Sequence, residues 1–267
     1  MGILNLTPDS FSDGGLFQSP EAAIRHALTM AGEGADIIDI GGESTRPGSE
    51  RVTADEQKSR VIDIITGLHA GLPEQVRISI DTTLATVAEA ALDAGAAMIN
   101  DVSAGRDDPE MISLAAERQC PIILMHMLGD PHTMQNNPVY SNAVEEIRAF
   151  LLERAELVQS KGVDGNNIII DPGIGFGKTK QHNLQIMNNL HRFVDTGFPV
   201  LLGASRKRFM GSICAETEFN QLVGATCATT ATGINAGVRI FRVHDVRANR
   251  QAADVAWAIR YQAGTTG

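Results

Sequence analysis

Aromatic residues, cysteines and positive charge are all scarce in this sequence of 267 residues. Phe, Trp and Tyr together make up 4% of the chain, whereas hydrophobic residues as a whole make up 43%. A core must therefore be filled mainly by aliphatic side chains and Ala. The three cysteines, Cys120, Cys214 and Cys227, contain no C-x-x-C pair, which disfavours a disulfide framework and favours a reducing compartment. We expect a cytoplasmic protein.

Basic residues are too few for a nucleic-acid-binding surface. Lys and Arg total 22 against 32 Asp and Glu, and the formal net charge is −10, whereas nucleic-acid-binding domains present a basic face. A few local Arg and Lys can still make a pocket attractive to an anionic small molecule. No run approaches the roughly 18 apolar residues of a membrane helix, and the start lacks the features of a signal peptide. We expect neither nucleic acid nor membrane as a partner.

Short apolar runs recur along the chain, and amphipathic segments separate them. The eight runs are GILN (2–5), DIIDI (36–40), VRISID (76–81), AMIND (97–101), PIILMH (121–126), NIIID (167–171), PVLLG (199–203) and VRIFRV (238–243). Their brevity and β-branched content are typical of buried parallel strands. Helices are expected between them, for example over residues 20–34, 54–71, 84–95 and 142–162, near 206–214 and 219–236, and at the end over 247–262.

This alternation of strand and helix predicts right-handed crossovers in a parallel sheet. The chain is close to the roughly 250 residues of a typical (β/α)8 barrel. The sequence therefore predicts an α/β protein with a TIM barrel, forming one domain over residues 1–267. The alternative is an open doubly wound sheet. No G-x-G-x-x-G follows the first run, which disfavours a dinucleotide-binding version of that alternative.

Polar residues follow every expected strand, at the end where barrel enzymes place their active sites. In strand order they are Asn5; Glu43, Thr45 and Arg46; Asp81; Asn100 and Asp101; His126; Asp171; Ser205, Arg206 and Lys207; and Arg242 and His244. Each also has an ordinary structural interpretation. Asp81 could cap the next helix, Asn100-Asp101 could form a turn, His126 could be a core histidine, and the arginines could be surface charges.

Three groups among these residues are more specific. Ser205, Arg206 and Lys207 lie where a strand becomes a helix, which suits an anion. Arg242 and His244 alternate along the last strand and should point to one side, near the usual phosphate site of such barrels. Asp81, Asn100 and Asp171 could converge on a flat heterocycle with several N–H groups. These groups predict an enzyme that holds a planar ring and a phosphate-bearing group, with the Gly-rich loop after Asn5 acting as a lid.

At these residues the sequence resembles the dihydropteroate synthases of bacterial folate biosynthesis. The matching motifs, in order, are MGILNLTPDSFSDGG, GGESTRPGS, SIDT, INDVSAG, LMHM, DPGIGFGK, GASRKRFMG and FRVHDV. The resemblance implies condensation of 6-hydroxymethyl-7,8-dihydropterin diphosphate with 4-aminobenzoate by an SN1-like path. The products are 7,8-dihydropteroate and pyrophosphate. It also implies Mg2+ as the cofactor and a homodimer.

The resemblance further implies a role for each matching residue. The pterin would be held by Asp81, Asn100, Asp171 and Lys207. The diphosphate would be bound by Asn5, Arg46, Arg242 and His244, with Asn5 also at the metal. The site for 4-aminobenzoate would be framed by Phe11, Thr45, Pro47 and Ser205. The residues implied to act in catalysis are Asp81, Lys207, Asn5, Arg242 and His244.

Three other functions stay open at this stage. A pterin-binding methyltransferase barrel would carry similar Asp and Asn positions, but nothing here resembles a cobalamin module. A non-enzymatic relative would be expected to have lost one of the rim motifs, and none is broken. A Schiff-base aldolase would use Lys207 as its nucleophile, although the flanking Arg206 and Arg208 suit a lysine that binds an anion.

Overall fold

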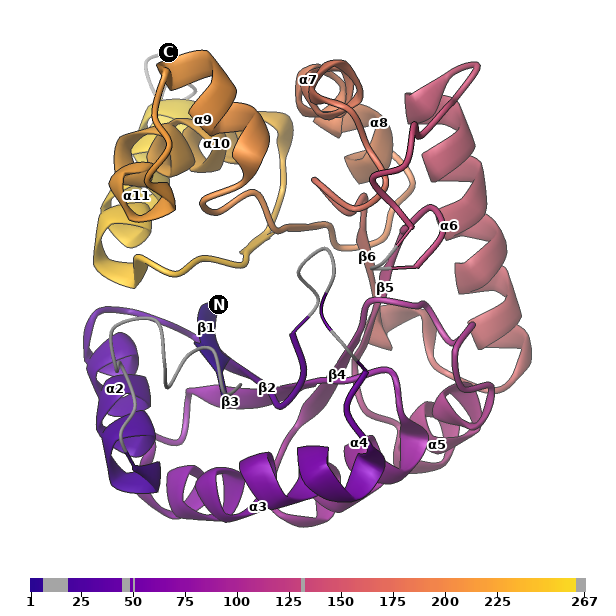
Figure 1. The fold of residues 1–267 in the computed structure, drawn as a ribbon, viewed down its shortest axis with the longest axis vertical. Coiled ribbons are helices and arrows are strands. Elements are labelled where there is room, and N and C mark those ends of the chain that lie inside the picture. The colour runs from indigo at the N-terminus through magenta and orange to yellow at the C-terminus, as the bar shows by residue number, and fades with distance from the viewer. Residues whose placement is uncertain (7–18, 45–48, 50, 131–132, 263–267) are drawn as a thin grey trace.

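The computed structural model describes residues 1–6, 19–44, 49, 51–130 and 133–262, and the remaining residues are not described (Figure 1). The strands are β1 (Gly2–Asn5), β2 (Ile37–Gly41), β3 (Arg77–Asp81), β4 (Met98–Asp101), β5 (Ile122–Met125), β6 (Ile168–Asp171), β7 (Leu201–Leu202) and β8 (Ile240–Phe241). Each lies within a predicted apolar run or extends one residue beyond it. The strand predictions are therefore confirmed.

The strands form a closed parallel barrel. Strands β1 to β6 pair in sequence order, and β7 pairs with β8. Single parallel bridges join the two groups: Ile170 pairs with Val200, and Gly2 pairs with Val243. Every pairing is parallel, as consecutive β-α-β units require. The predicted (β/α)8 barrel is confirmed.

The last two strands are shorter than predicted. The sequence suggests strands over 199–203 and 238–243, whereas the paired ladder covers two residues on each side. The backbone hydrogen bonds of these segments are shared among neighbours instead. The N–H of Arg242 donates to Leu202, and the N–H of Val243 donates to Met1. Arg242 and His244 therefore follow β8 rather than alternating along it.

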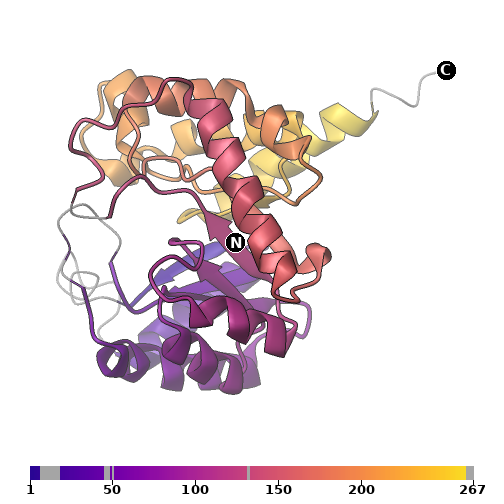
Figure 2. The ribbon, with the colours of Figure 1, turned by 90° about the vertical axis from the view of Figure 1, so that its right-hand side faces the viewer.

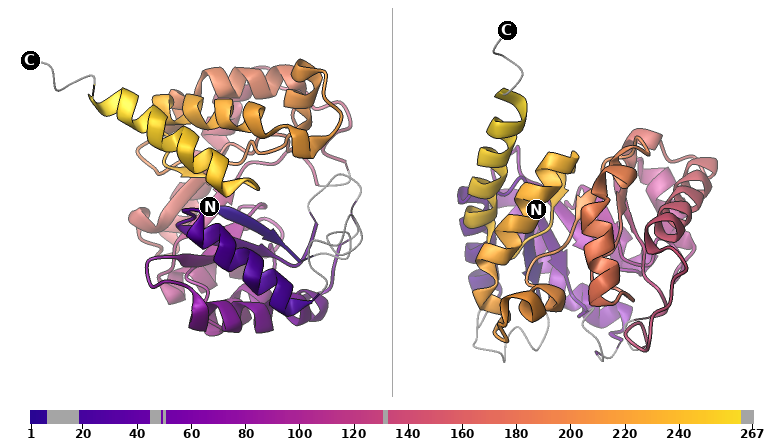
Figure 3. Two further views of the ribbon diagram at one scale, coloured as in Figure 1. Left: turned by 90° about the vertical axis from the view of Figure 1, so that its left-hand side faces the viewer. Right: turned by 90° about the horizontal axis from the view of Figure 1, so that it is seen from above.

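Helices surround the barrel (Figures 1 and 2). They are α2 (Pro20–Gly32), α3 (Ala54–Gly71), α4 (Ala85–Asp93), α5 (Glu110–Arg118), α6 (Ala143–Ser160), α7 (Lys180–Asn188), α8 (Leu190–Val194), α9 (Arg208–Cys214), α10 (Val223–Ala236) and α11 (Val246–Gln262), with short 3-10 turns at Gly165–Asn167 and Phe219–Gln221. Ser19, Thr53, Asn142 and Thr179 accept backbone hydrogen bonds at the starts of α2, α3, α6 and α7. Helix α11 extends past its neighbours (Figure 3). No helix in the described residues is long and apolar enough to cross a membrane.

An apolar layer fills the lower part of the barrel interior. Its buried members are Met1, Met98, Ile123, Ile169 and Leu201, and Ile37 and Ile240 pack against them. Side chains on a strand alternate between its two faces, so the next inward position lies two residues further along. On β4, β6 and β2 those positions hold Asn100, Asp171 and Asp39. The barrel therefore changes from an apolar floor to a polar mouth over one step of each strand.

Candidate active site

Four predicted residues lie at the mouth of the barrel, which we define as the carboxyl ends of the strands: Asn5, Asp81 and Asp171 end their strands, and Asn100 is the last residue but one of β4. The register pairs Asn5 with Gly41, Gly41 with Asp81, and Asp81 with Asn100, so these positions lie at one level. Asp81, Asn100 and Asp171 are buried, whereas Asn5 is half-buried. Gly41 lies between two of these side chains, because a Cβ there would be in van der Waals contact with both Asn5 Oδ1 and Asp81 Oδ2, at 3.7 Å.

Arg242 joins two carboxylates in the mouth. Its Nη2 donates to Asp81 Oδ2 at 2.7 Å, and its Nε donates to Asp39 Oδ2 at 2.6 Å. Asn100 Nδ2 also donates to Asp39 Oδ2, at 3.1 Å. Sequence reasoning missed Asp39, which is fully buried in the middle of β2. The available signal was its charge, because a carboxylate inside an otherwise apolar run needs a partner.

Asp81 does not cap the following helix. The N–H of Ala85, which opens α4, donates instead to Asp108 Oδ2 at 2.8 Å. Asp101, by contrast, has the alternative structural role, because its carboxylate accepts hydrogen bonds from the N–H groups of Ser103 and Gly105. Asn100 thus contacts Asp39 in the mouth, whereas its neighbour Asp101 holds the turn that follows β4.

Burial shifts the pKa values of the ionisable groups in the mouth toward neutrality. It raises the pKa of Asp81 to about 7, although Arg242 acts in the opposite direction. It also raises the pKa of Asp171 to about 6. Burial lowers the pKa of Arg242, but the carboxylates of Asp39 and Asp81 outweigh that effect, so its pKa is raised. The arginine stays charged, while the carboxyl groups of Asp81 and Asp171 titrate close to physiological pH.

Asp171 is anchored by the Gly-rich loop that follows it. Its Oδ1 accepts a hydrogen bond from the N–H of Gly173 at 2.7 Å. Gly173 has a φ of +68°, and a Cβ there would lie 2.0 Å from the carbonyl oxygen of His126. Only glycine fits this contact. On the other side, a Cβ at Gly203 would lie 3.7 Å from Asp171 Oδ2 and 4.0 Å from Arg242 Cβ, so Asp171 lies beside the arginine.

Lys207 faces the same loop from the start of α9. Its Nζ lies 4.1 Å from the centre of the Phe176 ring, a cation–π contact. Burial, followed by the nearby charge of Arg242, lowers the pKa of Lys207 to about 8. The lysine is therefore a hydrogen-bond donor at neutral pH with a proton that it can lose at moderately alkaline pH.

Ser205 and His244, from the segments after β7 and β8, form a hydrogen-bonded pair. The Oγ of Ser205 lies 2.9 Å from Nδ1 of His244 and accepts a hydrogen bond from the N–H of His244 at 3.2 Å. Arg206 differs from the prediction. Its guanidinium donates two hydrogen bonds to Asp245, at 3.0 and 2.7 Å, so it links the segments after β7 and β8 rather than standing ready for an anion.

His126 and Lys178 form a buried pair that contacts the Gly-rich loop after β6, residues 172–177. Lys178 Nζ lies 3.0 Å from His126 Nδ1 and donates to the carbonyl oxygen of Phe176 at 2.9 Å. Burial and the charge of Lys178 lower the pKa of His126 to about 2, and burial lowers the pKa of Lys178 well below its ordinary value. His126 is thus a neutral core residue that supports the loop. Sequence reasoning gave Lys178 no role, since nothing in the motif shows that it turns inward.

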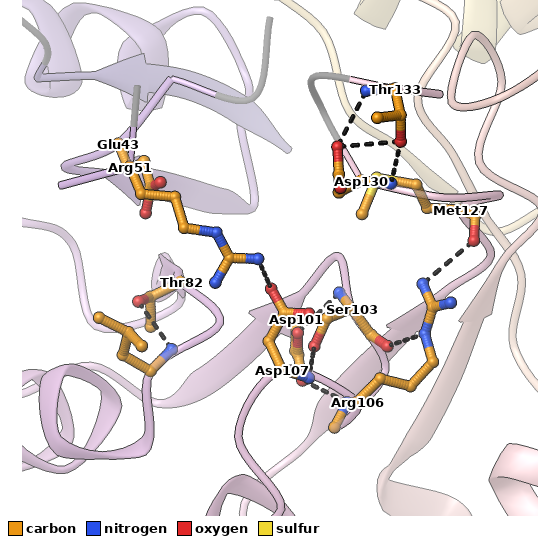
Figure 4. A network of polar contacts seen from close by, with 12 residues as sticks. Glu43, Arg51, Thr82, Asp101, Ser103, Arg106, Asp107, Met127, Asp130 and Thr133 are labelled. Atoms are coloured by element: carbon orange, nitrogen blue, oxygen red, sulfur yellow. Dashed lines mark hydrogen bonds and ion pairs between the residues drawn. The ribbon is translucent and has the colours of Figure 1, made fainter. Parts of the chain in front are cut away.

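Polar contacts also tie the loops around the mouth to one another (Figure 4). Arg51, after β2, donates to Asp107 Oδ2 at 2.9 Å, and the N–H of Asp107 donates to Ser103 Oγ at 3.2 Å. Arg106 continues the network to a carbonyl oxygen after β5, at 3.1 Å. One network of hydrogen bonds therefore links the segments after β2, β4 and β5.

Gln57 connects the segment after β2 to the end of β3. This fully buried side chain donates to Glu43 Oε2 at 2.7 Å and accepts from Thr82 Oγ1 at 2.9 Å. Burial raises the pKa of Glu43. Glu43 lies two residues before Thr45. The predicted residues Thr45, Arg46 and Pro47 lie outside the described residues, as Phe11 does.

Comparison with known proteins agrees with this geometry. A family model described as "Pterin binding enzyme" matches residues 1–244. A dihydropteroate synthase of Synechocystis sp. is 48% identical and aligns over 97% of this chain and 89% of its own length. The structure of Xanthomonas albilineans dihydropteroate synthase with 4-aminobenzoic acid has a TM-score of 0.90 at 42% identity, covering 98% of this chain and 92% of that one.

A second structure of dihydropteroate synthase from Xanthomonas albilineans, in complex with 7,8-dihydropteroate, has a TM-score of 0.87 at 40% identity. It covers 98% of this chain and 93% of that one. The similarity thus extends over the whole barrel and not only over the motifs at its mouth. The chain belongs to the pterin-binding enzyme family and, within it, to the dihydropteroate synthases.

Proposed function

We propose that the barrel mouth condenses 6-hydroxymethyl-7,8-dihydropterin diphosphate with 4-aminobenzoate, giving 7,8-dihydropteroate and pyrophosphate in folate biosynthesis. The chain is accordingly a transferase. The observation that carries the proposal is the joining of Asp81 and Asn100, through Asp39 and Arg242, at one end of the barrel. Such an arrangement offers acceptors to a heterocycle and a cation to its charged substituent.

The pterin end of the substrate is assigned to four side chains. Asp81 and Asp171 offer carboxylate oxygens to ring and amino N–H groups, and Asn100 offers an amide. Lys207 offers a donor and a positive charge toward the ring system. The pKa values of Asp81 and Asp171 are raised to about 7 and about 6, so both carboxyl groups titrate near neutral pH in the ligand-free protein. N–H groups of a bound ligand donate to carboxylates, so binding would favour the ionised forms of both residues.

The diphosphate is assigned to Asn5, Arg46, Arg242 and His244. Arg242 already holds its positive charge in the mouth, in contact with Asp81. His244 adds a ring nitrogen beside Ser205. Groups fixed in this way stabilise the charge that grows on the leaving diphosphate without having to reorganise during the reaction.

The residues present fit a magnesium ion of the kind that binds through substrate. The described residues contain no cluster of three His, Cys, Asp or Glu side chains suited to a metal. Mg2+ often keeps several waters and binds through one or two protein oxygens together with substrate phosphates. The amide oxygen of Asn5 is such a ligand, at the edge of the mouth. When bound there, Mg2+ would neutralise charge on the diphosphate.

The reaction then follows an SN1-like path. The bond between the pterin methylene carbon and the diphosphate oxygen breaks, and both electrons leave with pyrophosphate. The electron-rich dihydropterin ring delocalises the resulting positive charge, which the carboxylate of Asp81 favours electrostatically. The amine nitrogen of 4-aminobenzoate forms the new C–N bond and releases its extra proton to solvent. No strong general base is required, because the aromatic amine is neutral at pH 7.

The site for 4-aminobenzoate is assigned to Phe11, Thr45, Pro47 and Ser205. Ser205 is buried and precedes α9, and its hydroxyl is oriented by His244. The other three residues belong to the segments after β1 and β2. The hydrogen bond from Gln57 to Glu43 supports this assignment, since it holds the chain two residues before Thr45.

We further propose one domain over residues 1–267, a cytoplasmic location and a homodimer. The three free cysteines suit a reducing compartment. Helix α11 exposes two apolar pairs, Val255 with Ile259 on one side and Trp257 with Tyr261 on the other, and a second copy of the chain could cover either pair. The long projection of α11 beyond its neighbours favours the same arrangement (Figure 3).

Pyrophosphate release tests the function. Release should depend on both the pterin diphosphate and 4-aminobenzoate, and Asp81→Asn and Lys207→Met should each reduce kcat/KM by about a hundredfold or more. Lys180→Met is a matched control, since this exposed lysine lies at the start of α7. Tight binding of methyltetrahydrofolate with no response to the pterin diphosphate would instead indicate a methyltransferase. Full activity in Asp81→Asn would refute the site assignment.

A further inference from the structure

Asp39 is a buried carboxylate that the proposed reaction does not use. It lies on β2, one inward step above the apolar layer and one step below Gly41, which has no side chain. Its side chain is fully buried. Asn100 and Arg242 both donate to the same oxygen, Oδ2, at 3.1 and 2.6 Å. The residue thus contacts two proposed ligand-binding residues from beneath.

The contact with Asn100 determines which way round its amide lies. An ionised carboxylate accepts hydrogen bonds and cannot donate them. Asn100 must therefore turn its NH2 group toward Asp39, which leaves its carbonyl oxygen for another partner. Amide orientations are set by such networks. Arg242 donates to the same oxygen of Asp39 at 2.6 Å, so this oxygen acts as an acceptor toward both of its partners.

The second contact fixes the plane of Arg242. Its Nε is taken by Asp39 and its Nη2 by Asp81, so the guanidinium spans two carboxylates from neighbouring strands. A planar fork held at two points has little freedom to turn. A single oxygen of Asp39 therefore fixes both the orientation of the Asn100 amide and the plane of the Arg242 guanidinium.

We propose that Asp39 is a positioning residue that makes Asn100 a hydrogen-bond acceptor for an N–H of the substrate ring and holds Arg242 between two carboxylates. This inference rests on the proposed function, because it assumes that the mouth binds a pterin. It predicts that Asp39 determines recognition of the pterin diphosphate and not of 4-aminobenzoate.

A purely structural role predicts something different. A buried charge is costly, and apolar replacements of buried ion pairs are often neutral or stabilising. The inward position one step below Asp39 on the same strand is Ile37, which packs against the apolar layer. A carboxylate at this level is therefore unfavourable for packing, and its value should show in ligand recognition.

Exchanging the side chains of Asp39 and Asn100 tests the proposal. In Asp39→Asn the new amide can face Asn100 in either direction, and binding of 6-hydroxymethyl-7,8-dihydropterin diphosphate should weaken by about ten- to a hundredfold. In Asn100→Asp two carboxylates would face each other, and binding should weaken at least as much. In the double variant Asp39→Asn/Asn100→Asp, the amide at position 39 donates to the carboxylate at position 100, and about tenfold or more of the lost affinity should return.

Ser79→Ala is the matched control. Ser79 is fully buried, is the register partner of Asp39 on β3, and makes no side-chain hydrogen bond within the described residues. The affinity of Ser79→Ala for the pterin diphosphate should stay within about twofold of wild type. That change is smaller than the one expected from losing a buried hydrogen bond. For all variants, KM for 4-aminobenzoate should change by no more than about twofold, while the affinity for the pterin diphosphate varies.

The outcomes separate the two proposals. If wild type does not bind the pterin diphosphate or release pyrophosphate, the proposed function fails. If wild type is active and Asp39→Asn binds the pterin diphosphate as tightly, the positioning role is refuted. It is also refuted if the affinities for both substrates fall together and the exchange restores neither. Should Asp39→Asn not fold, the comparison of Asn100→Asp with the double variant decides the question alone.

Discussion

Nη2 of Arg242 lies 2.7 Å from Oδ2 of Asp81, so a residue assigned to the diphosphate is ion-paired with a residue assigned to the pterin. The two positions are 161 residues apart in sequence. Because the substrate carries both groups, its binding brings a new anion toward Arg242 and new N–H donors toward Asp81 at the same time. The ion pair thus places the two halves of the proposed site within one hydrogen bond of each other.

The fork geometry of Arg242 should matter beyond its charge. A lysine at this position keeps the positive charge but cannot donate to Asp39 and Asp81 in a fixed plane, which leaves one buried carboxylate without its partner. We expect Arg242→Lys to lower kcat/KM for the pterin diphosphate by about a hundredfold, as expected for a charge-assisted hydrogen bond. Steady-state kinetics measure this. Arg250→Lys, which changes an exposed arginine paired with Asp254, should be close to wild type.

The pKa of Lys207 predicts an alkaline limit to activity. Since burial lowers this pKa to about 8, the ligand-free enzyme loses the ammonium proton around that pH, and kcat/KM for the pterin diphosphate should fall above it. Lys207→Arg should remove the alkaline limb, because a guanidinium stays protonated throughout the range. The pH profile of kcat/KM for the two enzymes measures this. The same alkaline limb in both would show that another group titrates.

Asp171 should make the ligand-free protein less stable as the pH rises. Its pKa is raised from 3.8 to about 6 in the folded state, so between these values the folded state binds more protons than the unfolded state. Asp171→Asn keeps an acceptor for Gly173 but does not titrate. We expect its free energy of unfolding to grow relative to wild type by on the order of 2 kcal/mol between about pH 4.5 and about pH 7, and then to stay constant.

Urea unfolding of both proteins at several pH values measures this difference. A difference that does not vary with pH would mean that Asp171 is ionised equally in the folded and unfolded states. Activity should be lost in Asp171→Asn at every pH, because the assigned pterin acceptor has lost its charge. Stability gained with activity lost is typical of a residue kept for ligand binding.

Much of this site could be predicted because a parallel barrel places the end of every strand at one rim. Asn5, Asp81, Asn100 and Asp171 are visible in the sequence as polar residues that end apolar runs. Phe11, Thr45, Arg46 and Pro47 remain predictions, since they lie outside the described residues.

Other features depend on partners that no sequence pattern reveals. Asp39 is hidden inside an apolar run, and its role follows only from a contact with Arg242, which is 203 residues away. The sequence predicts Arg206 at an anion site, but two of its guanidinium nitrogens, Nε and Nη2, donate to Asp245. Gln57 is indistinguishable in sequence from a surface helix residue, yet it is fully buried between Glu43 and Thr82.

Gly173 should be the glycine at the mouth that is least tolerant of substitution. Its φ of +68° is unfavourable for any residue with a Cβ, and the added atom would lie 2.0 Å from a backbone oxygen of His126, which cannot turn away as a side chain could. Strain of this kind costs about 1–3 kcal/mol before any movement of the backbone is counted. Since the N–H of Gly173 donates to Asp171, such a movement would also displace an assigned pterin ligand.

We therefore expect Gly173→Ala to lower the free energy of unfolding by about 3 kcal/mol or more, in the range of strained core substitutions, and to weaken binding of the pterin diphosphate in the protein that still folds. Gly32→Ala is the control. Gly32 is the last residue of α2, is exposed, and would place its Cβ at least 4 Å from any neighbour outside its own helix. This control should be neutral or stabilising by up to about 1 kcal/mol. Equal stability of the two variants would show that the Gly-rich loop can move away from His126, and Asp171 would then not depend on the loop for its position.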